Sequence, residues 1–96
     1  MIRIFYTHRL AEITRTFEES LEISSPLSVR ELIDILTARY GNDFSGEVSV
    51  RSTELGTDSP FYLVFVDGNR ILETEKEEKK IREGSAVSFL PLMSGG

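Results

Sequence analysis

The chain has 96 residues, of which 40% are hydrophobic, and it contains no cysteine. This length and apolar content predict one domain over residues 1–96 with a core large enough to fold alone, and the missing thiols exclude disulfides, thiolate metal sites and a cysteine nucleophile. Sixteen acidic and eleven basic residues give a net charge of −5, which disfavours nucleic acid and anionic membranes as partners and favours a basic protein surface.

The first six residues alternate between two sides of an extended chain. Ile2 and Ile4 fall on one side and Phe5 falls on the other, and this period of two predicts a half-buried strand. The strand begins at the N-terminus without the apolar region of a signal peptide, and no window approaches the roughly eighteen apolar residues of a membrane span. We therefore expect a cytoplasmic protein.

A second strand is predicted between residues 13 and 23. The even positions are polar, whereas odd positions include apolar residues such as Phe17. The polar residues 7–12 are predicted to connect the two strands as an antiparallel hairpin. Because Glu19 interrupts the apolar side, the second strand is expected to be bulged or only partly buried.

A helix is predicted to follow Ser28. The residues Ser28 and Glu31 have the spacing of a capping box, in which each side chain bonds the other's backbone N–H, and Gly41 stands where a left-handed C-terminal cap is expected. The apolar stripe between them consists of Val29, Leu32, Ile33, Leu36 and Tyr40.

The segment from residue 42 to residue 60 is long for a connection in a compact domain. Val48 and Val50 alternate with polar residues, so the segment could form a short extra strand or a hairpin, closed by Gly56 and Pro60.

The third quarter of the chain predicts a buried hairpin. Residues 61–66 are continuously apolar, which favours a strand covered on both faces. The dipeptide Asp67-Gly68 predicts a tight turn into a short returning strand around residues 70–72. The charged run 72–83 is expected to be a solvated loop or helical turn, with Ile81 as its single anchor in the core.

The last predicted strand covers residues 85–90, and Pro91, which lacks an N–H, is expected to end its pairing. The residues beyond it, about 91–96, then form a flexible extended tail. Without Cβ atoms, Gly95 and Gly96 could thread into a narrow channel and present the ionised α-carboxylate of Gly96 for adenylation. The alternative is a frayed terminus without a role.

These elements predict an α+β fold, a mixed sheet of four or five strands with one main helix across one face. Side chains on the other face remain uncovered. Phe5 and Leu90 would lie there on adjacent strands beside the emerging tail, which predicts a docking surface, and the acidic charge would steer it towards a basic cleft.

The sequence shows no constellation of catalytic residues. His8 is the only histidine and has no partner at ligand spacing, the serines lack a histidine base, and no glycine-rich run precedes the helix to bind phosphate. We expect a substrate or carrier protein rather than an enzyme, with no bound metal or cofactor.

The order of elements resembles one known family. The resemblance is carried by the helix that opens at residues 27–33 and ends at Tyr40-Gly41, by segments 64–68, 81–84 and 87–91, and by the terminal Ser94-Gly95-Gly96. Together they resemble the MoaD/ThiS-type ubiquitin-like sulfur carriers, and most closely the small subunit of molybdopterin synthase.

This resemblance implies a β-grasp fold and a role for each tail residue. Gly96 would be adenylated by a ubiquitin-activating-type adenylyltransferase (MoeB/ThiF-like) that uses ATP, and then thiocarboxylated. Gly95 and Ser94 would form the neck of the tail, while Leu92 and Met93 would join Phe5 and Leu90 in contacting the partner.

The resemblance also implies an acceptor, the large subunit of molybdopterin synthase (MoaE-like), in which sulfur is donated during molybdenum or tungsten cofactor biosynthesis. Two departures from the family pattern are Leu92, where a second proline is common, and the segment 42–60, which is longer or different. Two alternatives remain open: a modifier joined through its C-terminal glycine to target lysines, and a β-grasp adaptor whose tail is idle.

Overall fold

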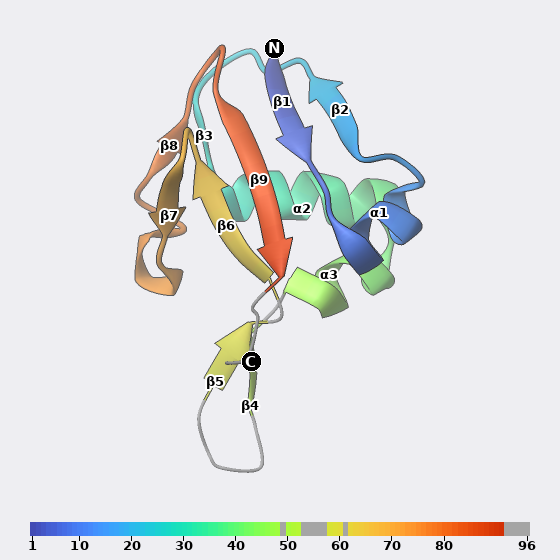
Figure 1. Cartoon of the computed structure of the whole chain (residues 1–96). Coiled ribbons are helices and arrows are strands. Elements are labelled where there is room, and N and C mark those ends of the chain that lie inside the picture. Colours follow the sequence, from blue (N-terminus) through green and yellow to red (C-terminus); the bar gives the residue numbers. More distant parts are fainter. Residues whose placement is uncertain (49, 53–57, 61, 92–96) are drawn as a thin grey trace.

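The computed structural model describes residues 1–48, 50–52, 58–60 and 62–91. Its elements, shown in Figure 1, are β1 (Ile2–Phe5), α1 (His8–Thr14), β2 (Glu18–Leu21), β3 (Leu27–Ser28), α2 (Val29–Tyr40), α3 (Asn42–Val48), β4 (Val50–Ser52), β5 (Asp58–Pro60), β6 (Tyr62–Val66), β7 (Asn69–Ile71), the 3-10 turn η1 (Glu73–Glu75), β8 (Lys80–Ile81) and β9 (Ala86–Pro91).

The centre of the molecule is a five-stranded sheet with the order β2-β1-β9-β6-β7. Its two central strands, β1 and β9, are parallel, whereas the other neighbours are antiparallel. Helix α2 crosses one face of this sheet (Figure 1). The predicted α+β architecture, with a mixed sheet and a main helix on one face, is confirmed.

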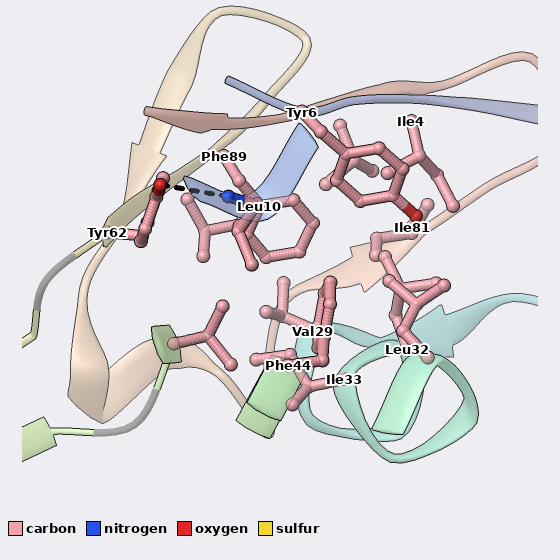
Figure 2. Close-up of a cluster of buried hydrophobic side chains, with 14 of the residues drawn as sticks. Ile4, Tyr6, Leu10, Val29, Leu32, Ile33, Phe44, Tyr62, Ile81 and Phe89 are labelled. Atoms are coloured by element: carbon pink, nitrogen blue, oxygen red, sulfur yellow. Dashed lines mark hydrogen bonds between the residues drawn. The ribbon is translucent and has the colours of Figure 1, made fainter. Parts of the chain in front are cut away.

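The core lies between the sheet and α2. Alternate residues of the central strands, including Ile4, Val87 and Phe89, point towards the helix and are completely buried. Figure 2 shows Ile4 and Phe89 facing Val29, Leu32 and Ile33 of α2 across the core. The sheet therefore buries one face only, as the alternation in the sequence predicts.

The connection between β1 and β2 differs from the prediction, because it contains helix α1. Leu10, Ala11 and Thr14 form the buried side of this helix. Its first turn is capped from another strand, since the hydroxyl of Tyr62 accepts a hydrogen bond from the Leu10 N–H at 3.2 Å (Figure 2). The antiparallel pairing of the two strands is confirmed. The predicted extent of the second strand is wrong, because residues 13 and 14 belong to α1 and β2 is only four residues long, so that Phe17 lies before it.

Helix α2 forms as the sequence predicts. Ser28 and Glu31 make both bonds of the capping box, each 3.0 Å long, and the apolar stripe faces the core. Gly41 has a positive φ of 89°, although its ψ of −173° is not that of a left-handed helical residue. Its N–H makes the last helical bond, to the Thr37 carbonyl at 2.7 Å, and its positive φ ends the helix.

The segment after α2 combines a helix with a hairpin. Strands β4 and β5 pair antiparallel, so the hairpin, one of the two alternatives that the sequence leaves open, is present. Residues 42–48 form α3, which was not predicted. Phe44 and Val48 are buried, one helical turn apart. The ring of Phe44 packs edge-on against Phe89, with 5.8 Å between the centroids. Gly56, which was predicted to help close the segment, lies outside the described residues.

Strand β6 is covered on one face only, contrary to the prediction. Tyr62 and Val64 are buried, whereas Leu63 and Phe65 are partly exposed on the other face. The physical reason is that no helix of the described chain crosses that face, and Phe61 lies outside the described residues. The turn at Asp67-Gly68 and the returning strand β7 are confirmed.

The charged run after β7 is anchored at two points instead of one. Ile81 is completely buried, as predicted, in β8, which pairs with β3. Lys76 is also buried, with only 5% of its surface exposed. Its amino group pairs with Glu73 at 2.7 Å and its carbonyl accepts from the Arg30 N–H at 3.1 Å, which holds the run against the start of α2.

Candidate docking site and tail root

The face of the sheet opposite α2 carries an apolar patch from three neighbouring strands. Ile4 and Val64 point to the core, and neighbouring residues along a strand point the opposite way. In the register of the sheet, Leu63 lies directly across from Leu90, and Leu90 is 39% exposed. The open-face patch consists of Phe5, Leu63, Phe65 and Leu90.

Sequence reasoning finds half of this patch. The structure places Phe5 and Leu90 on adjacent strands and on the same face, as expected, and their role in docking stays a prediction. Leu63 and Phe65 were missed because the strand was interpreted as covered on both faces. The signal that could have found them is the alternation along the strand, which places Leu63 on the same face of the sheet as Leu90.

A cation borders the patch on the β2 side. The guanidinium of Arg3 lies 5.2 Å from the centre of the Phe5 ring, close enough for a cation–π contact, and it also pairs with Glu18. Arg3 thus covers part of Phe5, which is only partly exposed. A partner that docks here meets an apolar centre with a charged rim on the β2 side.

The last strand is held where it ends, at a site that we name the tail root and that consists of Thr7, Tyr62, Phe89 and Pro91. The Thr7 hydroxyl donates a hydrogen bond to the Phe89 carbonyl at 2.9 Å. The Tyr62 hydroxyl donates to the Thr7 carbonyl at 3.1 Å, while Tyr62 itself stands opposite Pro91 in the ladder. The strand β6 and the β1–α1 junction therefore clamp the end of β9.

Pro91 does not end the pairing of β9, contrary to the prediction, because it still lies opposite Tyr62. The carbonyls of Ser85 and Phe89 bond Arg3 and Thr7 on the β1 side. Backbone groups of alternate residues share one side of a strand, so the nitrogen of Pro91 also faces that side. Since β1 has already ended at Phe5, no ladder bond is lost.

The other predicted tail residues lie outside the described part of the chain. They are Leu92, Met93, Ser94, Gly95 and Gly96. The docking role of Leu92 and Met93, the neck formed by Ser94 and Gly95, and adenylation at Gly96 therefore stay predictions.

A half-buried carboxylate ties the edge strand β2 to α2. Glu19 faces the helix and accepts hydrogen bonds from the hydroxyls of Tyr6, at 2.7 Å, and Tyr40, and it pairs with Arg39 at 2.5 Å. Burial first, and then the bond to Glu19, raise the pKa of Tyr6, so that its phenol remains a donor. The polar residue that interrupts the strand pattern is thus satisfied, and its role is structural.

Two further properties of the described residues bear on function. Within residues 1–48, 50–52, 58–60 and 62–91, no group of three or more histidine, aspartate or glutamate side chains is arranged to hold a metal ion. In the same ranges, none of the helices has the length and apolar character needed to cross a bilayer.

A mixed sheet with its last strand at the centre, one main helix behind it and an open apolar face define a ubiquitin-like β-grasp domain. A candidate molybdopterin converting factor, subunit 1, from Pyrococcus furiosus has this fold with a TM-score of 0.71 and 20% identity, over 96% of this chain and 97% of that chain. Small archaeal modifier protein 1 from Methanosarcina acetivorans matches with a TM-score of 0.71 and 19% identity, over 99% and 95%.

A chain of the Amycolatopsis orientalis BexX/CysO complex has a TM-score of 0.72 and 18% identity, with complete coverage of both chains. The model of the ThiS family matches residues 4–96. The chain therefore belongs to the ThiS family. Over 77 residues it is 36% identical to a candidate sulfur carrier protein from Archaeoglobus fulgidus, covering 79% of this chain and 83% of the relative.

Proposed function

We propose that the protein is a sulfur carrier whose C-terminal glycine, Gly96, is activated and loaded with sulfur by partner enzymes. The observation that carries the proposal is the family match, which runs to residue 96 and so includes Ser94-Gly95-Gly96. The relative from Archaeoglobus fulgidus, described as a candidate sulfur carrier, supports the same function.

The chemistry needs only a free carboxylate from this chain. In the first step the Gly96 carboxylate attacks the α-phosphorus of ATP on the activating enzyme, which forms an acyl-adenylate and releases pyrophosphate. Hydrosulfide supplied by a sulfur donor then attacks the carbonyl carbon, the bond from this carbon to the AMP oxygen breaks, and loss of the sulfur-bound proton leaves a C-terminal thiocarboxylate and free AMP. The partner provides the acid, the base and the nucleotide site, so the carrier acts as a substrate and not as a catalyst.

The open-face patch is the surface that would dock on these partners. It lies on β1, β6 and β9, beside the point where the tail leaves β9. Burial of an apolar centre with a polar rim is the usual anatomy of a protein interface. The net charge of −5 would add attraction towards a basic cleft.

Within the family we place the carrier in the molybdopterin branch, as a small subunit that donates its sulfur inside a large catalytic subunit. The Pyrococcus furiosus structure supports this placement through its fold. A second candidate is a protein modifier joined to target lysines, which the likeness to the small archaeal modifier protein favours. Both functions begin with the same acyl-adenylate.

The test is the intact mass of the protein after incubation with an activating enzyme, ATP and a sulfur source. Exchange of one carboxylate oxygen for sulfur is expected in the full chain and not in a variant that lacks Gly96. Equal exchange in both would refute the assignment of Gly96. Gly-Gly remnants on lysines of other cellular proteins, without transfer of sulfur to a pterin precursor, would favour the modifier.

A further inference from the structure

We propose that an open recess beside α1 receives an apolar side chain of the enzyme that activates the C-terminus, and that Phe17 is its specificity-determining contact. The recess, which we call the α1 recess, has a volume of about 520 Å³. It is lined by Thr7, His8, Ala11, Glu12 and Phe17. This inference rests on the proposed function and adds a second contact to the open-face patch.

Phe17 is the most exposed large apolar side chain in the described residues, with 75% of its surface accessible. Its backbone is nevertheless held on both sides. The Phe17 carbonyl accepts the Tyr6 N–H at 2.9 Å, and the preceding carbonyl of Thr16 accepts the hydroxyl of Thr14 at 2.9 Å. An aromatic ring held in water by a fixed backbone, next to a recess, is typical of a site that a partner covers.

The backbone around the recess is also strained. His8 and Arg15, at the two ends of α1, have positive φ angles of 49° and 61°. Residues with side chains seldom adopt this region, and such outliers persist where the surrounding structure holds them, often at functional sites. The fold thus keeps α1 and the turn before Phe17 in one fixed geometry.

The recess lies at the tail root. Thr7 lines the recess and bonds the Phe89 carbonyl at the end of β9, and Figure 1 shows α1 beside this end of the sheet. Thr7 is extended, with φ −131° and ψ 157°, and it has the same parity as Phe5. The recess therefore continues from the open-face patch.

The length of the tail places the activating enzyme here. Gly96, the residue proposed to be activated, is five positions beyond Pro91, and a fully extended chain of that length reaches at most about 17 Å. An enzyme that binds Gly96 in its active site must then approach the tail root to about that distance. Its surface meets the recess as well as the open-face patch.

The lining identifies the occupant as an apolar side chain with a basic neighbour. The Phe17 ring and the Ala11 methyl group supply the apolar walls. Glu12 stands at the rim with 72% of its side chain exposed, and it makes a long contact of 3.4 Å to Arg9. A cation on the partner beside its apolar side chain would pair with this carboxylate.

The test uses the full chain and ATP–pyrophosphate exchange by the ubiquitin-activating-type adenylyltransferase of the same organism. Phe17→Ser is expected to raise the KM for the carrier by about tenfold or more, as for an aromatic interface anchor, with kcat unchanged. Phe17→Leu should restore part of the affinity. The control is Leu72→Ser, because Leu72 is 49% exposed and follows β7, the edge strand far from β2; its KM should change by less than about twofold.

Thermal unfolding of each variant verifies the fold. If the wild-type chain supports exchange and Phe17→Ser leaves the KM unchanged, this inference is overturned and the proposed function remains intact. An equal rise in KM for Leu72→Ser would have the same meaning. A fall in kcat at constant KM would also overturn it, since Phe17 is assigned to binding. If the wild-type chain supports no exchange at all, the proposed function fails and the inference fails with it.

Discussion

Replacing Tyr62 by phenylalanine tests how the tail root is held. Tyr62 is buried, with 3% of its surface exposed, and its hydroxyl makes two hydrogen bonds: it accepts from the Leu10 N–H at 3.2 Å and donates to the Thr7 carbonyl at 3.1 Å. The substitution removes only the hydroxyl. The ring and its packing between α1 and β9 remain.

The structure sets the size of the effect. A hydrogen bond contributes a net 0.5–1.5 kcal/mol or so to stability. The Leu10 N–H also donates to the Thr7 carbonyl at 3.2 Å, so neither group is left wholly unpaired and no full desolvation penalty is added. We expect Tyr62→Phe to lower the free energy of unfolding by about 1–2 kcal/mol, which corresponds to a Tm lower by roughly 5–10 °C for a domain of this size.

Urea denaturation followed by circular dichroism measures the loss, and amide exchange at Leu10 reports where it arises. Tyr62→Leu is the matched control, since it also removes the ring and should destabilise the fold further. A midpoint for Tyr62→Phe equal to that of the wild type would refute the clamp. So would an unchanged exchange rate at Leu10 with a lowered stability, because the loss would then lie elsewhere.

Three further predictions concern other parts of the molecule. Leu90→Asp places a charge in the open-face patch and should weaken binding to the activating enzyme about tenfold or more while leaving the Tm nearly unchanged; calorimetric titration that finds the wild-type affinity would exclude Leu90 from the interface. Ser28→Ala removes the N-cap of α2 and should lower the free energy of unfolding by about 1 kcal/mol, whereas Ser28→Gly should cost only a few tenths; equal denaturation midpoints for all three proteins would contradict the capping box. The backbone N–H of Ser28 first, and then its side chain, lower the pKa of Glu31. A carboxyl whose pKa is lowered by folding stabilises the fold above its unfolded pKa, about 4.3, and this contribution is lost as the pH falls through the folded value. Glu31→Gln should therefore reduce the loss of stability as the pH falls below the unfolded pKa of about 4.3, and an unaltered pH profile would refute this assignment.

The parts of the fold that were predicted correctly are those whose signals are local. The capping box from Ser28 to Glu31 is complete within four residues. The buried positions of Val87 and Phe89 and the exposed position of Leu90 follow from the two-residue period of a strand. In both cases the sequence contains the entire physical cause of the structure.

The parts that were missed depend on distant contacts. Helix α1 is seven residues long, too short to be stable by itself, and its first turn is capped by Tyr62 from β6. In the same way α3 is held by packing of Phe44 against Phe89. Phe44 and Phe89 are 45 positions apart in the sequence, and Tyr62 is still farther from α1. No local pattern could therefore predict these contacts.

The residues of the candidate site show the same difference between local and distant causes. The buried side of each central strand follows from alternation, but exposure of the opposite side depends on what the rest of the chain covers. Phe65 shows this, because its segment is apolar throughout and only the absence of a covering helix, within the described residues, leaves it accessible. The recess beside α1 was beyond prediction for the same reason, since Phe17 was assigned to a strand.

The position of β9 in the sheet bears on how the proposed carrier would present its terminus to a partner. The strand lies between β1 and β6, so its residues are hydrogen-bonded on both sides, and Thr7 extends the support to Phe89 after β1 has ended. A strand at the edge of the sheet would be held on one side only and could fray when a partner pulls on the tail. Placement at the centre of the sheet supports β9 on both sides as far as its last residues, and the orientation of the body fixes where β9 ends.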